Sequence, residues 1–238
     1  MTQSPALVLT AHGSADPRAA AVTHAIAGRV RRLRPELDVR VAFCEQNAPL
    51  LPDMLTSLAG EVVVTPLLLA NAYHARVDIP AMIEASGATV RQAPVLGEDP
   101  ALLHVLRQRL TEAGVSGDDS DVGVIVTAVG TSNAAANAQT ATVATALRLG
   151  TRWAGTRVAF ATGNQPGLAD AELRLRAAGA RRLVIAPWFL AHGRLTDRVA
   201  DYAAAHGISM AEPLGPHNLV AATVLDRYDA AVATRIAA

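Results

Sequence analysis

Short runs of aliphatic and β-branched residues alternate along the chain with longer amphipathic segments rich in Ala, Leu and Arg. The runs predict strands, because the buried strands of parallel sheets read as continuous apolar stretches. In the first half the predicted strands are 7–10, 39–43, 61–65 and 89–91. The predicted helices are 19–34, 49–58, 78–85 and 100–113. Strands that alternate with helices predict an α/β fold with an open parallel sheet and right-handed crossovers.

The same pattern starts again in the second half of the chain. Four short segments recur in the same order, at offsets of 117 to 121 residues. The matched pairs are 9–14 with 126–131, 40–43 with 157–160, 64–70 with 185–191, and 96–97 with 214–215. Chance supplies one or two such matches but hardly four in register, so the pattern indicates an internal duplication.

The duplication predicts two tandem α/β domains of similar fold. The best linker lies at 115–121, where the residues are small and polar. The N-terminal domain is therefore expected to span 1–114, and the C-terminal domain 122–238.

Composition and charge narrow the functional classes. Arg and Lys together number 21, as do Asp and Glu, and the zero formal net charge argues against a general nucleic-acid binder. No charge run suggests a membrane patch, and the longest mainly apolar stretch, 62–72, is far short of the roughly 20 residues that span a bilayer. The N-terminus lacks the features of a signal peptide, so a cytoplasmic location is expected.

Two further counts bear on the core and on metal chemistry. Aromatic residues make up only 3% of the chain, so the core must be aliphatic. Cys44 is the single cysteine, which excludes an intrachain disulfide and any all-cysteine zinc or iron–sulfur site. It precedes Glu45 at the end of a predicted strand, and by alternation its side chain should point into the packing between sheet and helices.

Polar side chains of the first half cluster where its predicted strands end. His12 follows the first strand and Glu45 the second, while Tyr73, His74, Arg76 and Asp78 follow the third. In open α/β sheets ligands bind beyond the carboxyl ends of the strands. These side chains are therefore expected at one edge of the sheet.

The duplication provides an internal control for this cluster. The shared residues are Gly, Pro and aliphatic, as expected of residues that preserve a fold, whereas the imidazoles and the carboxylate occur in one copy only. In the second copy Val129 replaces His12, Thr162 replaces Glu45, and Leu195 replaces His74. Two imidazoles and a carboxylate suit Fe²⁺, Co²⁺, Ni²⁺ or Zn²⁺ and leave coordination positions open. The alternative is a saturated zinc site, or histidines that only form hydrogen bonds.

Three motifs of the first half resemble a known family. They are His-Gly-Ser at 12–14, Ala-Phe-Cys-Glu at 42–45 with Pro49 and Leu51 behind it, and Pro-Leu-Leu-Leu-Ala-Asn-Ala-Tyr-His-Ala-Arg-Val-Asp-Ile-Pro at 66–80. They resemble the sirohydrochlorin chelatases of the CbiX/SirB type, class II chelatases that share a fold with the protoporphyrin ferrochelatases. The second half resembles the non-catalytic partner domain of the long, two-domain members. The resemblance therefore implies two chelatase-like domains that face each other across a cleft, with the C-terminal one completing it.

The resemblance also implies the chemistry of the site. His12 and His74 would bind the incoming metal and accept protons, and Glu45 would assist, while the metal is a substrate and no cofactor is permanently bound. Insertion releases two pyrrole protons, for which neutral imidazole has a suitable pKa near pH 7. Sirohydrochlorin carries many carboxylates, so arginines are plausible contacts. The candidate substrate contacts are Ser14, Arg18, Tyr73 and Arg76 from the first half, and His192, Arg194 and Arg198 from the second.

Several functions remain open at this point. The first is an enzyme that inserts a metal into sirohydrochlorin: iron for sirohaem, cobalt for a cobalamin precursor, or nickel. The absence of a His-rich tract and of a ferredoxin-like Cys cluster favours iron. The second is a metal or tetrapyrrole carrier without turnover, and a two-lobed periplasmic-type binding protein is a third, disfavoured reading. We expect a monomer, because the repeat would replace the partner subunit of a dimeric ancestor.

Overall fold

A computed structural model describes residues 4–163 and 166–234, and it confirms the alternation of strands and helices. The N-terminal sheet is parallel with the order β2-β1-β3-β4. Its strands are β1 (Ala6–Ala11), β2 (Val39–Phe43), β3 (Val62–Pro66) and β4 (Val90–Gln92). The central strands β1 and β3 are almost fully buried, as expected for a parallel sheet covered on both faces.

The helices around this sheet begin and end close to the predicted positions, with one exception. They are α1 (Pro17–Leu33), α2 (Leu51–Ser57) and α3 (Ile79–Ser86). The exception is a π-helical turn, η1 (His74–Asp78), which directly precedes α3 and which the pattern did not predict. Helix α1 begins where Pro17 follows the N-cap Asp16, whose side chain accepts the Arg18 backbone N–H. No helix in the described ranges is long and apolar enough to cross a membrane.

The C-terminal sheet repeats the first one. Its order is β6-β5-β7-β8, again parallel, with β5 in the central position of β1. The strands are β5 (Val122–Ala128), β6 (Gly155–Phe160), β7 (Arg182–Pro187) and β8 (Ser209–Met210). The helices that pack with this sheet are α4 (Pro100–Glu112), α5 (Ala134–Arg148), α6 (Leu168–Ala177) and α7 (Arg194–Ala205), and the last described helix is α8 (Asn218–Ala233).

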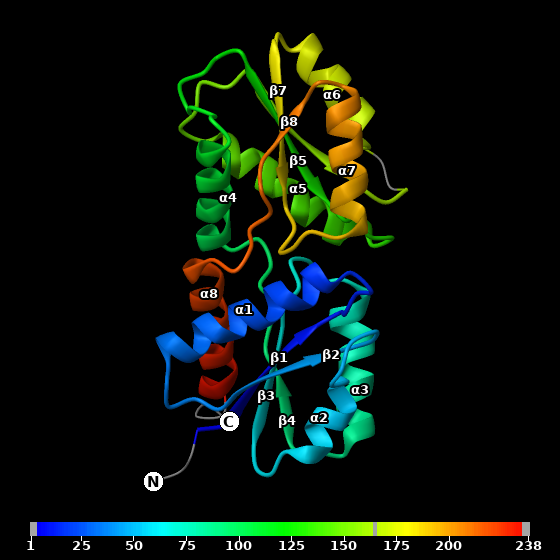
Figure 1. The fold of residues 1–238 in the computed structure, drawn as a ribbon, viewed down its shortest axis with the longest axis vertical. Coiled ribbons are helices and arrows are strands. Elements are labelled where there is room, and N and C mark those ends of the chain that lie inside the picture. Colours follow the sequence, from blue (N-terminus) through cyan, green and yellow to red (C-terminus); the bar gives the residue numbers. More distant parts are fainter. Residues whose placement is uncertain (1–3, 164–165, 235–238) are drawn as a thin grey trace. The chain divides into compact units, whose positions relative to one another are not determined.

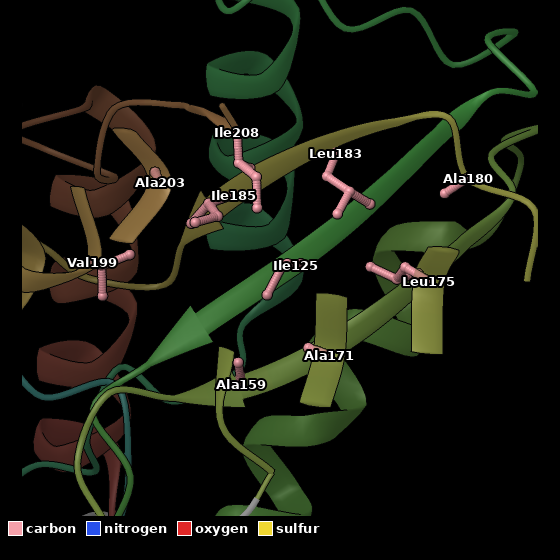
Figure 2. Packing of buried hydrophobic residues seen from close by; sticks show 10 residues of the cluster. All are labelled: Ile125, Ala159, Ala171, Leu175, Ala180, Leu183, Ile185, Val199, Ala203 and Ile208. Atoms are coloured by element: carbon pink, nitrogen blue, oxygen red, sulfur yellow. The ribbon is translucent and has the colours of Figure 1, made fainter. Parts of the chain in front are cut away.

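Aliphatic side chains fill both cores, as the low aromatic content predicted. In the second half Ile125, Ile185 and Leu183 from the sheet meet Leu175 from α6 and Val199 from α7 (Figure 2). In the first half the equivalent cluster joins the sheet to α2 and α3. Its buried members are Val8, Ala42, Leu51, Leu55, Val62, Val64 and Ile79. Cys44 packs against this cluster, as predicted.

The compact units have different bounds from the predicted domains. Unit 1 consists of the chain up to Gly97 together with the segment from Pro216, and unit 2 consists of Glu98–Gly215. Helix α8, coloured red in Figure 1, packs against α1 and β3, whereas α4 packs against α5 and β7. The last helix of each repeat therefore covers the sheet of the other repeat, and the predicted linker at 115–121 lies inside unit 2.

The chain passes from one compact unit to the other directly after each copy of the fourth repeated motif, the Leu-Gly pair. Gly97 and Gly215, the second residues of the two Leu-Gly pairs, have φ angles of 63° and 66°, which favour glycine. The two exchanged helices, α4 and α8, are each held beside such a pair by hydrogen bonds from an arginine side chain. In unit 1, Arg227 of α8 donates to the Val95 and Leu96 carbonyls at 3.0 and 2.8 Å. In unit 2, Arg109 of α4 donates to the Leu214 carbonyl at 3.2 Å.

Candidate functional site

Three polar side chains lie together beyond the carboxyl ends of the strands of unit 1. His12 directly follows β1, Glu45 comes two residues after β2, and His74 opens η1 after β3. The imidazole rings of His12 and His74 are 4.1 Å apart between centroids, with 36° between their planes. His12 Nε2 lies 3.4 Å from Glu45 Oε1. The topology thus brings together residues that are more than 60 positions apart in the sequence.

The backbone holds His12 and Glu45 in register beyond the ends of their strands. The Cys44 N–H donates to the Ala11 carbonyl, and the Glu45 N–H donates to the His12 carbonyl at 3.0 Å. Gly13 makes this approach possible, since its φ angle is 97° and a Cβ there would lie 1.8 Å from the Glu45 carbonyl oxygen. The glycine of His-Gly-Ser is therefore required by the geometry of the site.

The π-helical turn positions His74. Its closing bond runs from the Ile79 N–H to the His74 carbonyl, five residues back. Pro80 has no N–H to donate to residue 76, so a regular α-helical ladder cannot form there. The turn is fixed to the sheet because the Gln92 side chain, at the end of β4, donates to the Ala75 carbonyl at 2.7 Å.

A fourth polar residue, Asp78, belongs to this site although the sequence did not single it out as a site residue. Its Oδ2 lies 2.5 Å from Nδ1 of His74. The i,i+4 spacing of the two residues was a signal that could have found it, since such residues share one face of a helix. The site therefore contains two imidazole–carboxylate pairs, His12 with Glu45 and His74 with Asp78.

The surroundings favour the neutral form of His12. Partial burial lowers its pKa, and the neighbouring His74 lowers it further, while Glu45 and Asp78 act in the opposite direction. Its Nδ1 is buried and has no hydrogen-bond partner among the described residues. Burial also raises the pKa of the Cys44 thiol to about 11, helped by Asp78 and Glu45. In the metal-free protein this thiol therefore stays protonated at neutral pH.

The ligand-type side chains are close but not arranged around one point. Within the described ranges, no group of three His, Cys, Asp or Glu side chains is arranged to hold a metal ion. The His12 and His74 rings lie against each other, and each is turned toward its own carboxylate. The role of His12, His74 and Glu45 as a metal-ligand set stays a prediction.

Two of the predicted substrate contacts lie in the loop after β1. The Ser14 N–H donates to Asn47 Oδ1 at 2.7 Å, and its hydroxyl oxygen accepts the Asp16 N–H at 3.0 Å. Arg18 forms an ion pair with Asp16, with 2.6 Å between Nη2 and Oδ2. Ser14 thus shapes the loop, and Arg18 must leave a carboxylate before it can bind another.

The other two contacts predicted from the first half flank His74. Tyr73 is 63% exposed, and its ring meets the His74 ring edge-on with 6.2 Å between centroids. Arg76 is exposed on η1, and its guanidinium has no ion-pair partner among the described residues. Of the two arginines predicted as substrate contacts in unit 1, Arg76 is therefore the one more readily available to bind a substrate carboxylate.

The remaining predicted contacts belong to unit 2. His192 pairs with Glu212 in that unit, with 2.7 Å between Nε2 and Oε2. Arg194 and Arg198 are exposed residues of α7. The pair with Glu212 gives His192 a local hydrogen-bonding role. Among the described residues, nothing in the surroundings of His192 supports its predicted contact with substrate.

A family comparison matches both repeats. The sequence model of the family described as CbiX matches residues 6–113 and again residues 123–231, which together are most of the chain. The chain belongs to the CbiX family. The two matched segments follow the duplication seen in the sequence, whereas the compact units exchange their last helices.

Curated relatives of this CbiX-family chain carry one name. The sirohydrochlorin cobaltochelatase of Methanothermobacter thermautotrophicus is 27% identical over 132 residues, which cover 45% of this chain and 91% of the relative. The protein of that name from Priestia megaterium is 29% identical over 151 residues, or 60% of this chain and 49% of the relative.

Solved structures share the fold over nearly the whole chain. SirB from Bacillus subtilis, determined with Fe³⁺, superposes with a TM-score of 0.83 at 19% identity, covering 98% of both chains. CbiX described as the terminal enzyme of sirohaem biosynthesis in denitrifying bacteria superposes with a TM-score of 0.69 at 23% identity, covering 95% of this chain and 99% of the other. These likenesses establish the two-repeat chelatase fold predicted from the sequence.

Proposed function

We propose that this protein is a sirohydrochlorin chelatase, which inserts a divalent metal ion into the tetrapyrrole and releases two protons. One observation carries the proposal. In a chain of the CbiX family, two imidazoles lie in contact, each beside a carboxylate, at the ligand-binding edge of one sheet only. The equivalent positions of the other sheet hold side chains that neither bind metals strongly nor accept protons, among them Val129 and Leu195.

The site residues suit the chemistry that insertion requires. Two pyrrole N–H bonds break, each bonding electron pair stays on its nitrogen, and these nitrogens bind the metal while both protons pass to bases. His12 and His74 are the proposed first ligands of the metal, and they become the bases once the metal has passed to the pyrrole nitrogens and freed their lone pairs, with Glu45 assisting. The lowered pKa of His12 keeps a lone pair available at neutral pH. The backbone bonds that lock His12 to Glu45 supply the positioning on which rate acceleration depends.

The substrate is proposed to bind over η1. Its macrocycle is apolar on its faces and carries carboxylates at its rim, so it needs an exposed aromatic or aliphatic surface beside a cation. Tyr73 is such a surface, and Arg76 supplies a guanidinium without an acidic partner. Arg18 and Ser14 are secondary contacts, and His192 and Arg194 remain proposed contacts from the second repeat.

Two metals are candidates for the physiological substrate. We propose Fe²⁺, for sirohaem, because the sequence lacks a His-rich tract. Co²⁺ is the second candidate, because the curated relatives from Methanothermobacter thermautotrophicus and Priestia megaterium are named cobaltochelatases. Imidazole and carboxylate ligands suit both ions, so selectivity rests on geometry and metal supply. We further propose that the protein acts as a cytoplasmic monomer.

The test is the absorbance change of sirohydrochlorin mixed anaerobically with Fe²⁺, Co²⁺ or Ni²⁺. The wild-type protein should accelerate insertion, and His12→Ala/His74→Ala should lower the rate by at least roughly 100-fold, since a positioned base alone contributes about 10²–10⁴-fold. A matched control replaces two exposed histidines outside the site, His24→Ala/His104→Ala, and should keep the wild-type rate.

Each outcome decides between functions. Acceleration that is lost in the double variant and kept in the control supports the chelatase and ranks its metals. Tight pigment or metal binding without acceleration over the uncatalysed rate would support a carrier instead. Acceleration that survives loss of both imidazoles would remove the proposed site.

A further inference from the structure

We propose that Asp78 is a positioning residue, which fixes the orientation and tautomer of His74 so that Nε2 of this imidazole faces the metal and the pyrrole proton. The inference rests on the proposed function for its consequence in catalysis, but its structural part does not. It starts from the contact of 2.5 Å between Asp78 Oδ2 and His74 Nδ1.

The contact determines which nitrogen of His74 is available. The Asp78 carboxylate is an acceptor, so Nδ1 must carry the hydrogen that it donates. Nε2 then keeps its lone pair in the neutral ring, and this is the nitrogen that can bind a metal or accept a proton. Histidines that ligate metals commonly donate their other ring N–H to a carboxylate in this way.

A purely structural role does not account for Asp78. It stands at the N-cap position of α3, but its side chain makes no capping hydrogen bond. Elsewhere aspartates of this arginine-rich chain pair with guanidinium groups, as Asp38 does with Arg40 and Asp229 with Arg34. The ion-pair partner of Asp78 among the described residues is His74, although the exposed Arg76 is only two positions away.

The second repeat shows that the two residues are lost together. Thr10 pairs with Pro66 in unit 1 as Thr127 pairs with Pro187 in unit 2, so the repeats align at these prolines. Counting on from them, Leu195 stands for His74 and Val199 for Asp78. Val199 is 1% exposed and belongs to the apolar core of unit 2. Asp78 and His74 thus occur together in the first repeat and are both absent from the second, as expected of two residues that act as a functional pair.

The proposal adds a second imidazole–carboxylate pair to the mechanism. In the insertion step the metal would leave His74 Nε2 for the macrocycle, which frees the lone pair of Nε2. One pyrrole N–H bond breaks, its electrons remain on the nitrogen that binds the metal, and the proton passes to the freed Nε2. The hydrogen stays on Nδ1 and remains donated to the Asp78 carboxylate throughout, so the ring does not turn when it becomes charged. The proton then leaves Nε2 for water, and the protein returns to its starting state.

The first experiment measures the tautomer of His74 in the full-length, metal-free protein by ¹⁵N NMR of labelled imidazoles at pH 8. We expect the Nδ1–H tautomer in the wild type and its loss in Asp78→Ala, with the Nε2–H form becoming dominant. Asp38→Asn removes a carboxylate that pairs with Arg40 away from the site, and should leave His74 unchanged. An Nε2–H tautomer in the wild type overturns the proposal.

The second experiment measures Co²⁺ affinity by absorption and metallation kinetics on the same variants. We expect Asp78→Ala and Asp78→Asn to weaken Co²⁺ binding by roughly 10- to 100-fold and to lower kcat by a similar factor with KM for sirohydrochlorin unchanged. Asp78→Glu should recover part of both. Affinity and kcat at wild-type values in Asp78→Ala, which removes the acceptor and is folded as judged by its Tm, overturn the proposal.

The two proposals can fail separately. If the wild type binds Co²⁺ without metallating sirohydrochlorin, while Asp78→Ala still loses the Nδ1–H tautomer and Co²⁺ affinity, the positioning role stands and the chelatase function falls. If metallation depends on His12 and His74 but not on Asp78, the function stands and the positioning role falls.

Discussion

The two repeats share one backbone scaffold but not one set of side chains. Beyond the strand ends, the Glu45 N–H donates to the His12 carbonyl in the first, and the Thr162 N–H donates to the Val129 carbonyl at the same 3.0 Å in the second. The bond from the Phe43 N–H to the Pro49 carbonyl returns as the bond from Phe160 to Pro166. These equivalent bonds confirm the alignment of His12 with Val129 that was made from the sequence.

The difference between the repeats lies in what the scaffold presents at the strand ends. The first repeat presents two imidazoles and two carboxylates there, and the equivalent positions of the second hold three aliphatic side chains and a threonine. Residues common to both, such as the Leu-Gly pairs at 96–97 and 214–215, are those that the backbone needs. Residues found in one copy are those to which we assign the metal and the two protons.

Truncation should have the largest effect, because each repeat depends on a helix of the other. A chain that ends after Ser116 loses α8, whose Val220 and Val224 are fully buried in unit 1. It keeps α4 but loses the sheet that α4 covers. We expect no cooperative thermal unfolding transition and strong aggregation, measured by circular dichroism and light scattering.

The matched control is a chain that contains all of unit 1, including α8, and lacks unit 2. Residues 4–97 joined to 216–234 by a flexible linker contain unit 1 with its own covering helix, and should unfold cooperatively. A well-folded monomer of 1–116 would contradict the exchanged arrangement, because it would show that α8 is dispensable to the first sheet.

Substitution of Gly13 should come next in size and should act on one repeat alone. In Gly13→Ala the new Cβ would meet the Glu45 carbonyl oxygen, and the φ angle of 97° is unfavourable for alanine. We expect a loss of roughly 2–5 kcal/mol in the free energy of unfolding from urea denaturation, together with loss of chelatase activity.

Gly60 separates the strain of the backbone from the clash at the site. Its φ angle is 88°, yet no atom lies within 4 Å of the position of its Cβ. Gly60→Ala should therefore cost only about 1–2 kcal/mol and leave activity intact. Equal losses in the two variants would mean that the close approach of Gly13 to the Glu45 carbonyl is unimportant.

The smallest expected effect concerns Arg227 and Arg109, whose side chains hold the exchanged helices α8 and α4 by hydrogen bonds to backbone carbonyls. Arg227→Ala removes two hydrogen bonds to the Val95 and Leu96 carbonyls. Arg109→Ala removes one longer bond to Leu214 and an ion pair with the exposed Glu112, which contributes little. We expect losses of about 2 and about 1 kcal/mol respectively. Amide hydrogen exchange should show weakened protection in β1 and β3 for the first variant, and in β5 and β7 for the second. Weakening of the same sheet by both variants would argue against the exchange.

Local pattern was enough to predict most of the fold and the centre of the site. The apolar runs located β1 to β4 within one or two residues, because a buried parallel strand has few alternatives to a continuous apolar stretch. The duplication singled out His12, Glu45 and His74, which the strand order then brought together. Asp78 was named among the polar residues there, but its pairing with His74 was not predicted. The π-helical turn that joins the two residues follows from Pro80 and from the hydrogen bond between the Gln92 side chain and the Ala75 carbonyl.

By itself, the sequence determined that this protein is a duplicated α/β chain with its metal-capable residues in one copy. Periodicity and repeated motifs are local properties, and a single chain displays them in full. Only the tertiary structure decided that α4 and α8 exchange sheets and that each imidazole has its own carboxylate. The reason is physical: an amphipathic helix can cover either of two similar sheets, and a hydrogen bond depends on side-chain positions that sequence spacing leaves open.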